Sequence, residues 1–260
     1  MSTQEKIHLE WDFTKHAKYY SYRPNYAPTT ISMLVNAVKE NSKSDRVKVA
    51  DIGAGTANLS IMLLERGCEV VSVEPNDAMR SIGIERTQNH NSIKWVRATG
   101  SNTTLDDSTF DWVTFGSSFD CIDRSVALKE SHRLLKPNGI FTCMYNHRNL
   151  DDPIQKKAEN IIKDFIPQYS GGIRREDQRP VIESHTDLFD NIIFIEEDFY
   201  FHQTLENWIS AWRSVKNAYW DLDTQEGQEL FEKIIQKWKD SLPSEFDIKY
   251  TTRCWSARKI

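Results

Sequence analysis

The stretch VADIGAGTANLS, Val49 to Ser60, joins an apolar run to a helical pattern through a turn that contains two glycines. Asp51 lies near the end of the apolar run, and Gly53 and Gly55 follow it. In an open α/β sheet, ligands bind beyond the carboxyl ends of the strands, and glycines there let the backbone approach the ligand. The stretch therefore predicts a parallel sheet with a ligand site at this turn.

Strands and helices alternate along the rest of the chain. The patterns predict strands at 48–52, 69–73, 93–96, 110–115, 139–145, 191–201 and 248–258, and helices at 56–66, 77–87, 125–135, 151–165, 205–220 and 224–241. Residues 166–180 resemble a loop. The expected fold is α/β, a doubly wound and mostly parallel sheet of seven strands with a partly helical cap formed by 151–180 and 205–241.

Composition excludes several classes of protein. The chain has 260 residues and a formal net charge of -5, with basic and acidic residues interspersed, so we expect no nucleic-acid partner. No window is apolar enough for a membrane span or a signal peptide, so we expect no membrane partner and a cytoplasmic protein. The four cysteines lie far apart without a CxxC pair, which predicts reduced thiols and no metal site.

An acidic residue at the end of the second predicted strand suggests the kind of ligand. Glu74 follows Gly55 by 19 positions, where a carboxylate can accept both hydroxyls of a ribose. The dinucleotide fingerprint GxGxxG is incomplete, because Asn58 replaces its third glycine. Asp51 before the first glycine repels a pyrophosphate and suits an ammonium group. We therefore expect a nucleoside ligand other than a dinucleotide.

Four segments in this order resemble the class I S-adenosylmethionine-dependent methyltransferases of small molecules. They are VADIGAGTANLS, VSVEPNDAM, FDWVTFGSSFD and RLLKPNGIFTCMY, which together cover roughly Val47 to Tyr145. The resemblance implies a Rossmann-like methyltransferase fold that binds S-adenosyl-L-methionine. It implies an N-terminal lid segment and the cofactor-binding part within 1–150, and cap insertions with the last two strands of the same domain within 151–260.

The resemblance also implies roles for individual residues. Gly53, Ala54 and Gly55 pass under the cofactor, Asp51 orients its amino group directly or through water, and Glu74 binds its ribose. The remaining residues on the cofactor side are Met79, Gly100, Ser101, Ser117, Tyr19 and Arg23. Ala57 replaces the usual third glycine, a departure from the family pattern.

The flanking segments are similar to two narrower groups. HAKYYSYRPNY, His16 to Tyr26, and YTTRCWSAR near the end resemble the trans-aconitate-like methyltransferases. FGSSFDCID and YNHRNLDDPIQKK add a fainter similarity to N-methyltransferases of lincosamide biosynthesis. We expect methylation of an amine in a natural product or metabolite, with O-methylation of a small carboxylate or hydroxyl as the alternative. Monomer and oligomer both stay open.

Candidates for the acceptor side come from residues near strand ends. Phe119 is expected either to form a wall beside the sulfonium or to pack in the core. Tyr19 is expected to contact the reacting groups, with Tyr20 or Tyr22 structural, and the alternative for this segment is a packing helix. His147 follows the fifth strand and is either a base or a hydrogen-bonded bystander. We therefore list Tyr19, Phe119 and His147 as catalytic candidates.

Two other patterns are explained by packing or solvent exposure rather than by ligand binding. Trp208, Trp212, Val215 and Tyr219 at helical spacing indicate core rather than a substrate box. Arg174, Arg175 and Arg179 near Gly171-Gly172 indicate a solvated loop rather than a carboxylate site. Two rival functions are a nicotinamide-dependent oxidoreductase, against which Asp51 and the missing third glycine argue, and a non-catalytic binding module.

Overall fold

The computed structural model describes residues 12–170, 176–217 and 219–260. Its sheet contains seven strands in the order β3-β2-β1-β4-β5-β7-β6. The strands are β1 (Lys48–Ile52), β2 (Glu69–Val73), β3 (Ile93–Val96), β4 (Phe110–Gly116), β5 (Leu135–Arg148), β6 (Phe189–Thr204) and β7 (Glu245–Lys259). β7 runs antiparallel to both of its neighbours, β5 and β6, whereas the pairings among β1 to β5 are parallel. The predicted mostly parallel, seven-stranded Rossmann-like sheet is confirmed.

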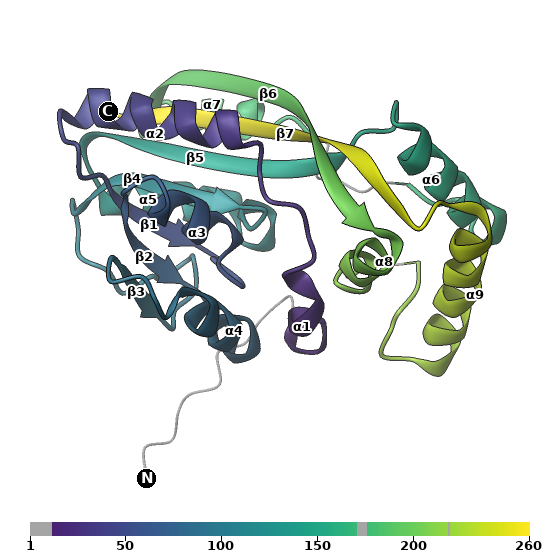
Figure 1. The fold of residues 1–260 in the computed structure, drawn as a ribbon. Helices are drawn as coiled ribbons and strands as arrows, with labels where there is room; N and C mark the ends of the chain where they lie inside the picture. The colour runs from purple at the N-terminus through teal and green to yellow at the C-terminus, as the bar shows by residue number, and fades with distance from the viewer. Residues whose placement is uncertain (1–11, 171–175, 218) are drawn as a thin grey trace, which may run out of the picture.

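Helices cover both faces of the sheet (Figure 1). They are η1 (Thr14–His16), α1 (Ala17–Tyr20), α2 (Pro28–Ser42), α3 (Asn58–Leu64), α4 (Asp77–Thr87), η2 (Phe119–Cys121), α5 (Arg124–Leu134), α6 (Pro153–Phe165), α7 (Arg179–Glu183), α8 (Leu205–Arg213) and α9 (Gln225–Ser241). Apolar residues of α2 and α3 share one buried cluster with strand residues, and those of α5 and α7 share another. This arrangement fits a doubly wound sheet.

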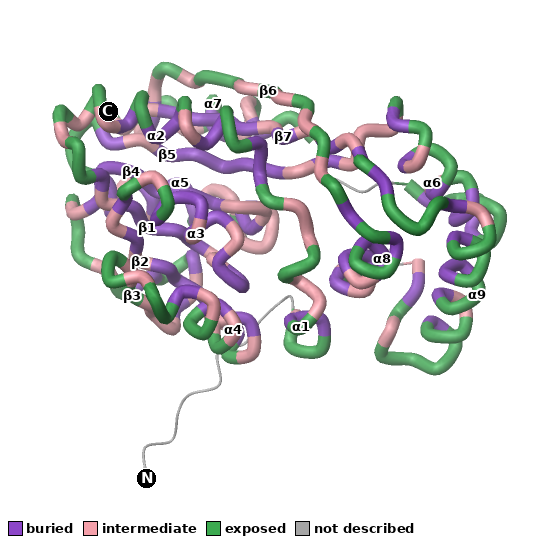
Figure 2. Tube along the Cα trace, in the orientation of Figure 1, coloured by how far each residue is buried: buried purple, intermediate pink, exposed green. Residues whose placement is uncertain are grey.

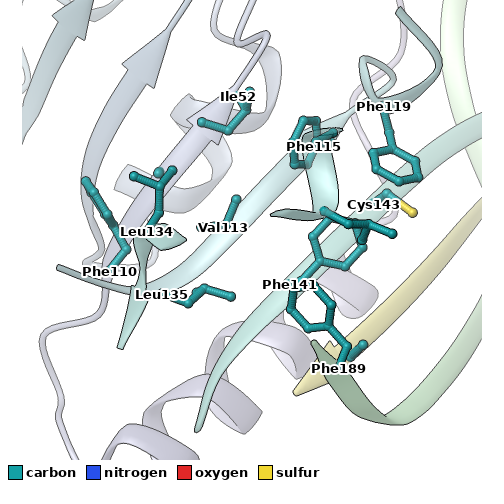
Figure 3. Packing of buried hydrophobic residues seen from close by; sticks show 14 of the residues in the cluster. Ile52, Phe110, Val113, Phe115, Phe119, Leu134, Leu135, Phe141, Cys143 and Phe189 are labelled. Carbon is teal, nitrogen blue, oxygen red and sulfur yellow. The ribbon is translucent and has the colours of Figure 1, made fainter. Parts of the chain in front are cut away.

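The two buried clusters lie on opposite faces of the sheet because side chains alternate in direction along the central strands. Val49 and Trp112 belong to the cluster of α2 and α3, whereas their neighbours Ala50 and Val113 belong to the cluster of α5. Successive side chains of a strand point to opposite faces, so a strand covered on both sides buries both sets. Figure 3 shows the second cluster, in which the rings of Phe115, Phe119 and Phe141 lie together. Figure 2 shows that the central strands are buried along most of their length.

A third buried cluster lies outside the body of the sheet. The long strands β6 and β7 pair from Phe189↔Lys259 to Thr204↔Glu245 and extend to α6, α8 and α9 (Figure 1). Apolar residues of these three helices pack with Phe246, Ile248 and Tyr250 of β7. We call this unit, α6, α8 and α9, the cap. It lies within the two segments predicted to form a cap.

Several predicted boundaries need correction. The sequence analysis did not predict α2, although Ile31, Leu34, Val35 and Val38 have helical spacing and are buried on the sheet. The strand predicted from 139 begins at Leu135, so β5 also includes 136–138. The helix predicted over 205–220 ends at Arg213, where the hydroxyl of Ser214 donates to the carbonyl of Ala211.

The structure adds two observations on the chain as a whole. All four cysteines are free thiols. Among the helices that the structure describes, none combines the length and the apolar character needed to cross a membrane.

Candidate active site

A cavity of about 890 Å³ opens at the carboxyl ends of β1, β2 and β4. The sheet order reverses between β1 and β4, which is where open α/β sheets bind ligands. The N-terminal segment, the first turn after β1, the loops after β2 and β4, the end of β5 and the cap all contribute to its lining. The volume lies in the range of small-molecule sites.

The turn after β1 has the left-handed backbone that favours glycine. Gly53 has a φ of 68° and Gly55 a φ of 58°. A Cβ added at Gly53 would lie 2.5 Å from the Cβ of Ser118, so the loop after β4 leaves no room for a side chain. Ala57, which replaces the family's third glycine, also has a φ of 72° and caps α3. The turn is therefore tight and backbone-lined, as the sequence predicted.

Asp51 is a fully buried carboxylate at the edge of the cavity. The hydroxyl of Ser60 donates to it at 2.6 Å and the hydroxyl of Thr114 at 3.2 Å. Burial raises the pKa of Asp51 to about 6, although both hydroxyl hydrogen bonds oppose the rise. Two hydroxyls thus fix the direction of this carboxylate and leave acceptor capacity toward the cavity.

Glu74 lies at the end of β2 with both carboxylate oxygens held by backbone donors. The amide of Gly55 donates to Oε2 at 2.8 Å, and the amide of Asn76 donates to Oε1 at 2.8 Å. Burial raises the pKa of Glu74 to about 7, with the two amides acting in the opposite direction. Each oxygen keeps a further lone pair, so the carboxylate can accept two more hydrogen bonds.

The loop after β4 separates two residues that the sequence analysis grouped together. Phe119 is completely buried, and its ring centroid lies 5.4 Å from those of Phe115 and Phe141. It does not line the cavity, so the core alternative for Phe119 holds and the wall beside the sulfonium is wrong. Asp120 lines the cavity instead. Ser117 also lines it and has a φ of 59°, an uncommon backbone for a residue other than glycine.

Three further residues predicted on the cofactor side, Met79, Gly100 and Ser101, also line the cavity. Met79 is buried in α4 and lies next to the turn after β1. A Cβ added at Gly55 in that turn would lie 3.1 Å from the Cε of Met79. Gly100 and Ser101 belong to a turn in which the hydroxyl oxygens of Thr99 and Ser101 lie 2.9 Å apart. Met79, Gly100 and Ser101 therefore lie where the sequence analysis expected them, and their contact with a cofactor stays a prediction.

The N-terminal segment presents Tyr20 and Arg23 to the cavity, whereas Tyr19 lies away from it. The short helix α1 directs neighbouring side chains to different sides, and the Tyr19 ring lies 4.8 Å below the ammonium of Lys18. Of the two neighbouring tyrosines of α1, Tyr20 rather than Tyr19 therefore lines the cavity. Arg23 stacks on Tyr20 and donates to the hydroxyl of Ser214 at 2.7 Å and to its carbonyl at 2.8 Å. These bonds join the N-terminal segment to the end of α8.

The end of β5 and the cap complete the cavity. His147 lines it and is 8% exposed, and the neighbouring Arg148 lies with its guanidinium carbon 3.5 Å from the Trp212 ring centroid. Trp208 and Trp212 are buried in the cap core, as the core alternative predicted. Trp212 also lines the cavity, together with Val215 and Tyr219 from the segment after α8.

The predicted arginine loop is only partly described. Gly171, Gly172, Arg174 and Arg175 lie outside the described residues. Arg179 is the first residue of α7, and 39% of its side chain is exposed. Its guanidinium Nη1 lies 3.8 Å from Oε1 of Glu183, which is consistent with a solvated position.

The comparison with known families follows from this geometry. Residues 50–143 match the family model described as a methyltransferase domain. This part of the chain is similar to a methyltransferase domain. The match spans β1 to most of β5 and includes the turn after β1, Glu74 and the loop after β4.

Curated methyltransferases match part of this chain. A demethylmenaquinone methyltransferase of Staphylococcus carnosus is 35% identical over 101 residues, which are 37% of this chain and 42% of that protein. An uncharacterized methyltransferase of Mycobacterium bovis is 30% identical over 131 residues, half of each chain. The chain thus spans half or less of the length of these relatives.

Solved methyltransferase structures share the fold over almost the whole chain. A protein from Anaeromyxobacter dehalogenans that is described as a type II methyltransferase by assignment superposes with a TM-score of 0.54 and 14% identity, covering 91% of this chain and 97% of that one. The phosphoethanolamine N-methyltransferase 2 of Haemonchus contortus gives a TM-score of 0.55 and 13% identity, covering 96% of this chain and 60% of that one. At these identities the similarity shows the fold alone.

Sequence reasoning missed several polar residues that line the cavity, among them Asp120, Arg148 and Asn217. Asp120 was quoted beside Phe119 but not chosen, although a strand end followed by an acid was itself a reason to consider it. Arg148 and Asn217 were not considered. Arg148 follows His147 directly, and its contact with Trp212 joins residues 64 positions apart, which no local pattern encodes.

Proposed function

We propose that this protein transfers a methyl group from S-adenosyl-L-methionine to a small-molecule acceptor, first of all an amine nitrogen. The observation that carries the proposal is the carboxylate of Glu74. Two backbone amides orient it, it keeps acceptor capacity, and it lines the same cavity as Asp51 and the turn after β1. O-methylation of a small carboxylate or hydroxyl is the alternative.

The chain's residues fit this cofactor at three points. The backbone of Gly53 and Gly55 approaches the cavity without side chains, Glu74 can accept the two ribose hydroxyls, and Asp51 can accept from an ammonium group. Met79, Gly100 and Ser101 would flank the base, and Arg23 and Ser117 would complete the cofactor side. The cofactor supplies an activated methyl group on a sulfonium.

Acceptor chemistry falls to residues at the ends of β4 and β5. Transfer from a sulfonium depends mainly on alignment of the acceptor and exclusion of water, which the cap and the N-terminal segment provide. Asp120 and His147 line this part of the cavity and can take the proton that an amine must lose. The cavity volume and its cover by the cap favour a small acceptor over a macromolecule.

Turnover with a panel of acceptors tests this function. The full chain is incubated with labelled S-adenosyl-L-methionine and with primary amines, carboxylic acids and phenols, and S-adenosylhomocysteine and the methylated product are measured by mass spectrometry. We expect product from at least one amine and, at subsaturating cofactor, a rate about 10- to 150-fold lower with Glu74→Ala. Product only from acids or phenols would favour the alternative, and cofactor binding without any turnover would favour a binding module.

A further inference from the structure

The part of the cavity next to the cap contains hydrogen-bond donors that have no role in the proposed binding of the cofactor. Arg148 at the end of β5 lines it, and no acidic side chain in the described part of the chain lies within ion-pair distance of its guanidinium. The group is half-buried and stacks on Trp212 at 3.5 Å. Stacking fixes the plane of the guanidinium and leaves its N–H groups available at the edge.

Two further donors lie on residues that line the same region. The indole Nε1 of Trp212 is buried and lacks a hydrogen-bond partner among the described residues, and Trp212 itself is 2% exposed. The Nδ2 of Asn217 is likewise buried without a partner there. The Oδ1 of Asn217 accepts from the amides of Tyr219 and Trp220, so the turn holds this amide by its oxygen. Buried donors without an acceptor cost free energy that a ligand oxygen recovers.

Packed aromatic rings fix the positions of these donors. The ring centroids of Trp212 and Trp220 lie 6.1 Å apart, and Tyr169 lies 5.0 Å from Tyr219 and stacks on Trp220 at 6.0 Å. The hydroxyl of Tyr219 bonds to Ser170 at 3.0 Å. A site on such a packed wall loses little side-chain entropy when a ligand binds.

The acceptor groups in this region do not offset the donors. Glu159 lines the cavity, but Lys163 pairs with it at 2.9 Å. Gln155 is buried and leaves its Oε1 without a partner among the described residues, so it suits a donor such as an amine N–H. Lys216 also lines the cavity, but its ammonium donates to the carbonyl of Asp12 in the N-terminal segment at 3.4 Å. The guanidinium of Arg148 and the two buried N–H donors therefore favour an oxyanion at this wall of the cavity.

We propose that Arg148, Trp212 and Asn217 form an anion subsite in the cap that holds a carboxylate or phosphate group of the acceptor. This inference rests on the proposed function, because it describes the acceptor of the same cavity. It narrows the substrate class to small amines that carry an oxyanion. A planar guanidinium with neighbouring N–H donors suits the two or three oxygens of such a group.

Binding of simple anions to the full chain tests the subsite without a known acceptor. The protein is saturated with S-adenosylhomocysteine and titrated by calorimetry with benzoate, phenyl phosphate and the neutral benzamide. We expect one or both anions to bind at least about tenfold more tightly than benzamide, since a charge-assisted hydrogen bond contributes about that factor or more. The stronger anion identifies the oxyanion as carboxylate or phosphate.

Variants separate the subsite from general effects of charge. Arg148→Met keeps the stem of the side chain and should weaken anion binding about tenfold or more, and Trp212→Phe keeps a ring and should weaken it by a smaller factor. Arg213→Met is the matched control, because Arg213 stacks over Phe231 and pairs with Glu232 outside the cavity lining. The control should bind both anions as the unmodified chain does. All three variants should bind S-adenosylhomocysteine normally.

Three results would overturn the proposal. They are equal binding of benzamide and the anions, full anion affinity in Arg148→Met, and no binding of either anion. If S-adenosylhomocysteine itself does not bind, the proposed function fails, and the same titration on the chain alone still decides whether the anion subsite exists.

Discussion

Replacing Glu74 by glutamine tests the role of its carboxylate through pH. With a pKa of about 7 in the free protein, this group is about 3% ionised at pH 5.5 and about 90% ionised at pH 8. Ribose hydroxyls donate to the ionised form, so binding at low pH must first remove a proton. We therefore expect the titration of Glu74 alone to lower the affinity for S-adenosylhomocysteine about 30-fold between pH 8 and pH 5.5.

Glutamine removes both the charge and the titration. At pH 8 Glu74→Gln should bind S-adenosylhomocysteine about 10- to 150-fold more weakly, which corresponds to about 1.5–3 kcal/mol for hydrogen bonds to a charged acceptor. At pH 5.5 the two proteins should differ far less, since the unmodified carboxyl is then mostly protonated. Asp51, whose pKa is about 6, titrates in both proteins, so its contribution cancels in the comparison.

Calorimetry at both pH values measures the effect, and thermal unfolding confirms that the variant folds. The glutamine amide also places an N–H group against a backbone donor of Gly55 or Asn76, so a modest loss of stability is expected. A gap between the two proteins that does not change with pH, or equal affinity at pH 8, would refute the assignment of Glu74 to the ribose.

Three further substitutions test the fold and the chemistry. Gly53→Ala should lower the free energy of unfolding by more than Gly67→Ala. Both glycines have a positive φ, which costs alanine about 1–2 kcal/mol, but only at Gly53 would the added Cβ lie 2.5 Å from Ser118. Equal losses of stability in chemical denaturation would contradict the clash. Trp238→Ala should lower the free energy of unfolding by about 3–5 kcal/mol in the same assay, because the completely buried ring packs in the cap core. A loss below about 1 kcal/mol would mean that the cap is not packed as described. His147→Ala should keep turnover within about 10- to 100-fold of the unmodified protein, and a folded variant with full cofactor affinity and no turnover would make this histidine the indispensable base.

The parts of the molecule that local patterns encode were predictable from the sequence. Gly53, Gly55 and Glu74 each lie at the end of a parallel strand, and strands of this kind bring their carboxyl ends to one edge. A short apolar run followed by glycine or an acid therefore indicates both the strand and the site. The helix α2 was equally readable, since Pro28 precedes apolar residues at helical spacing, but β-branched residues within it resemble a strand.

Directions of single side chains were not predictable in short turns. Phe119 and Asp120 are neighbours, and the turn η2 alone decides that the ring enters the core while the acid lines the cavity. The same one-residue difference separates Tyr19 from Tyr20 in α1. The anion subsite lies still further from local patterns, because Arg148 and Trp212 meet only after β5 and α8 pack together.

A calorimetric titration of the unmodified chain with S-adenosylhomocysteine and, separately, with NAD tests the central claim most directly. The turn after β1, Asp51 and Glu74 predict a single site for S-adenosylhomocysteine and no comparable heat with NAD. Saturable binding of NAD together with no binding of S-adenosylhomocysteine would contradict the account and make this cavity a dinucleotide site.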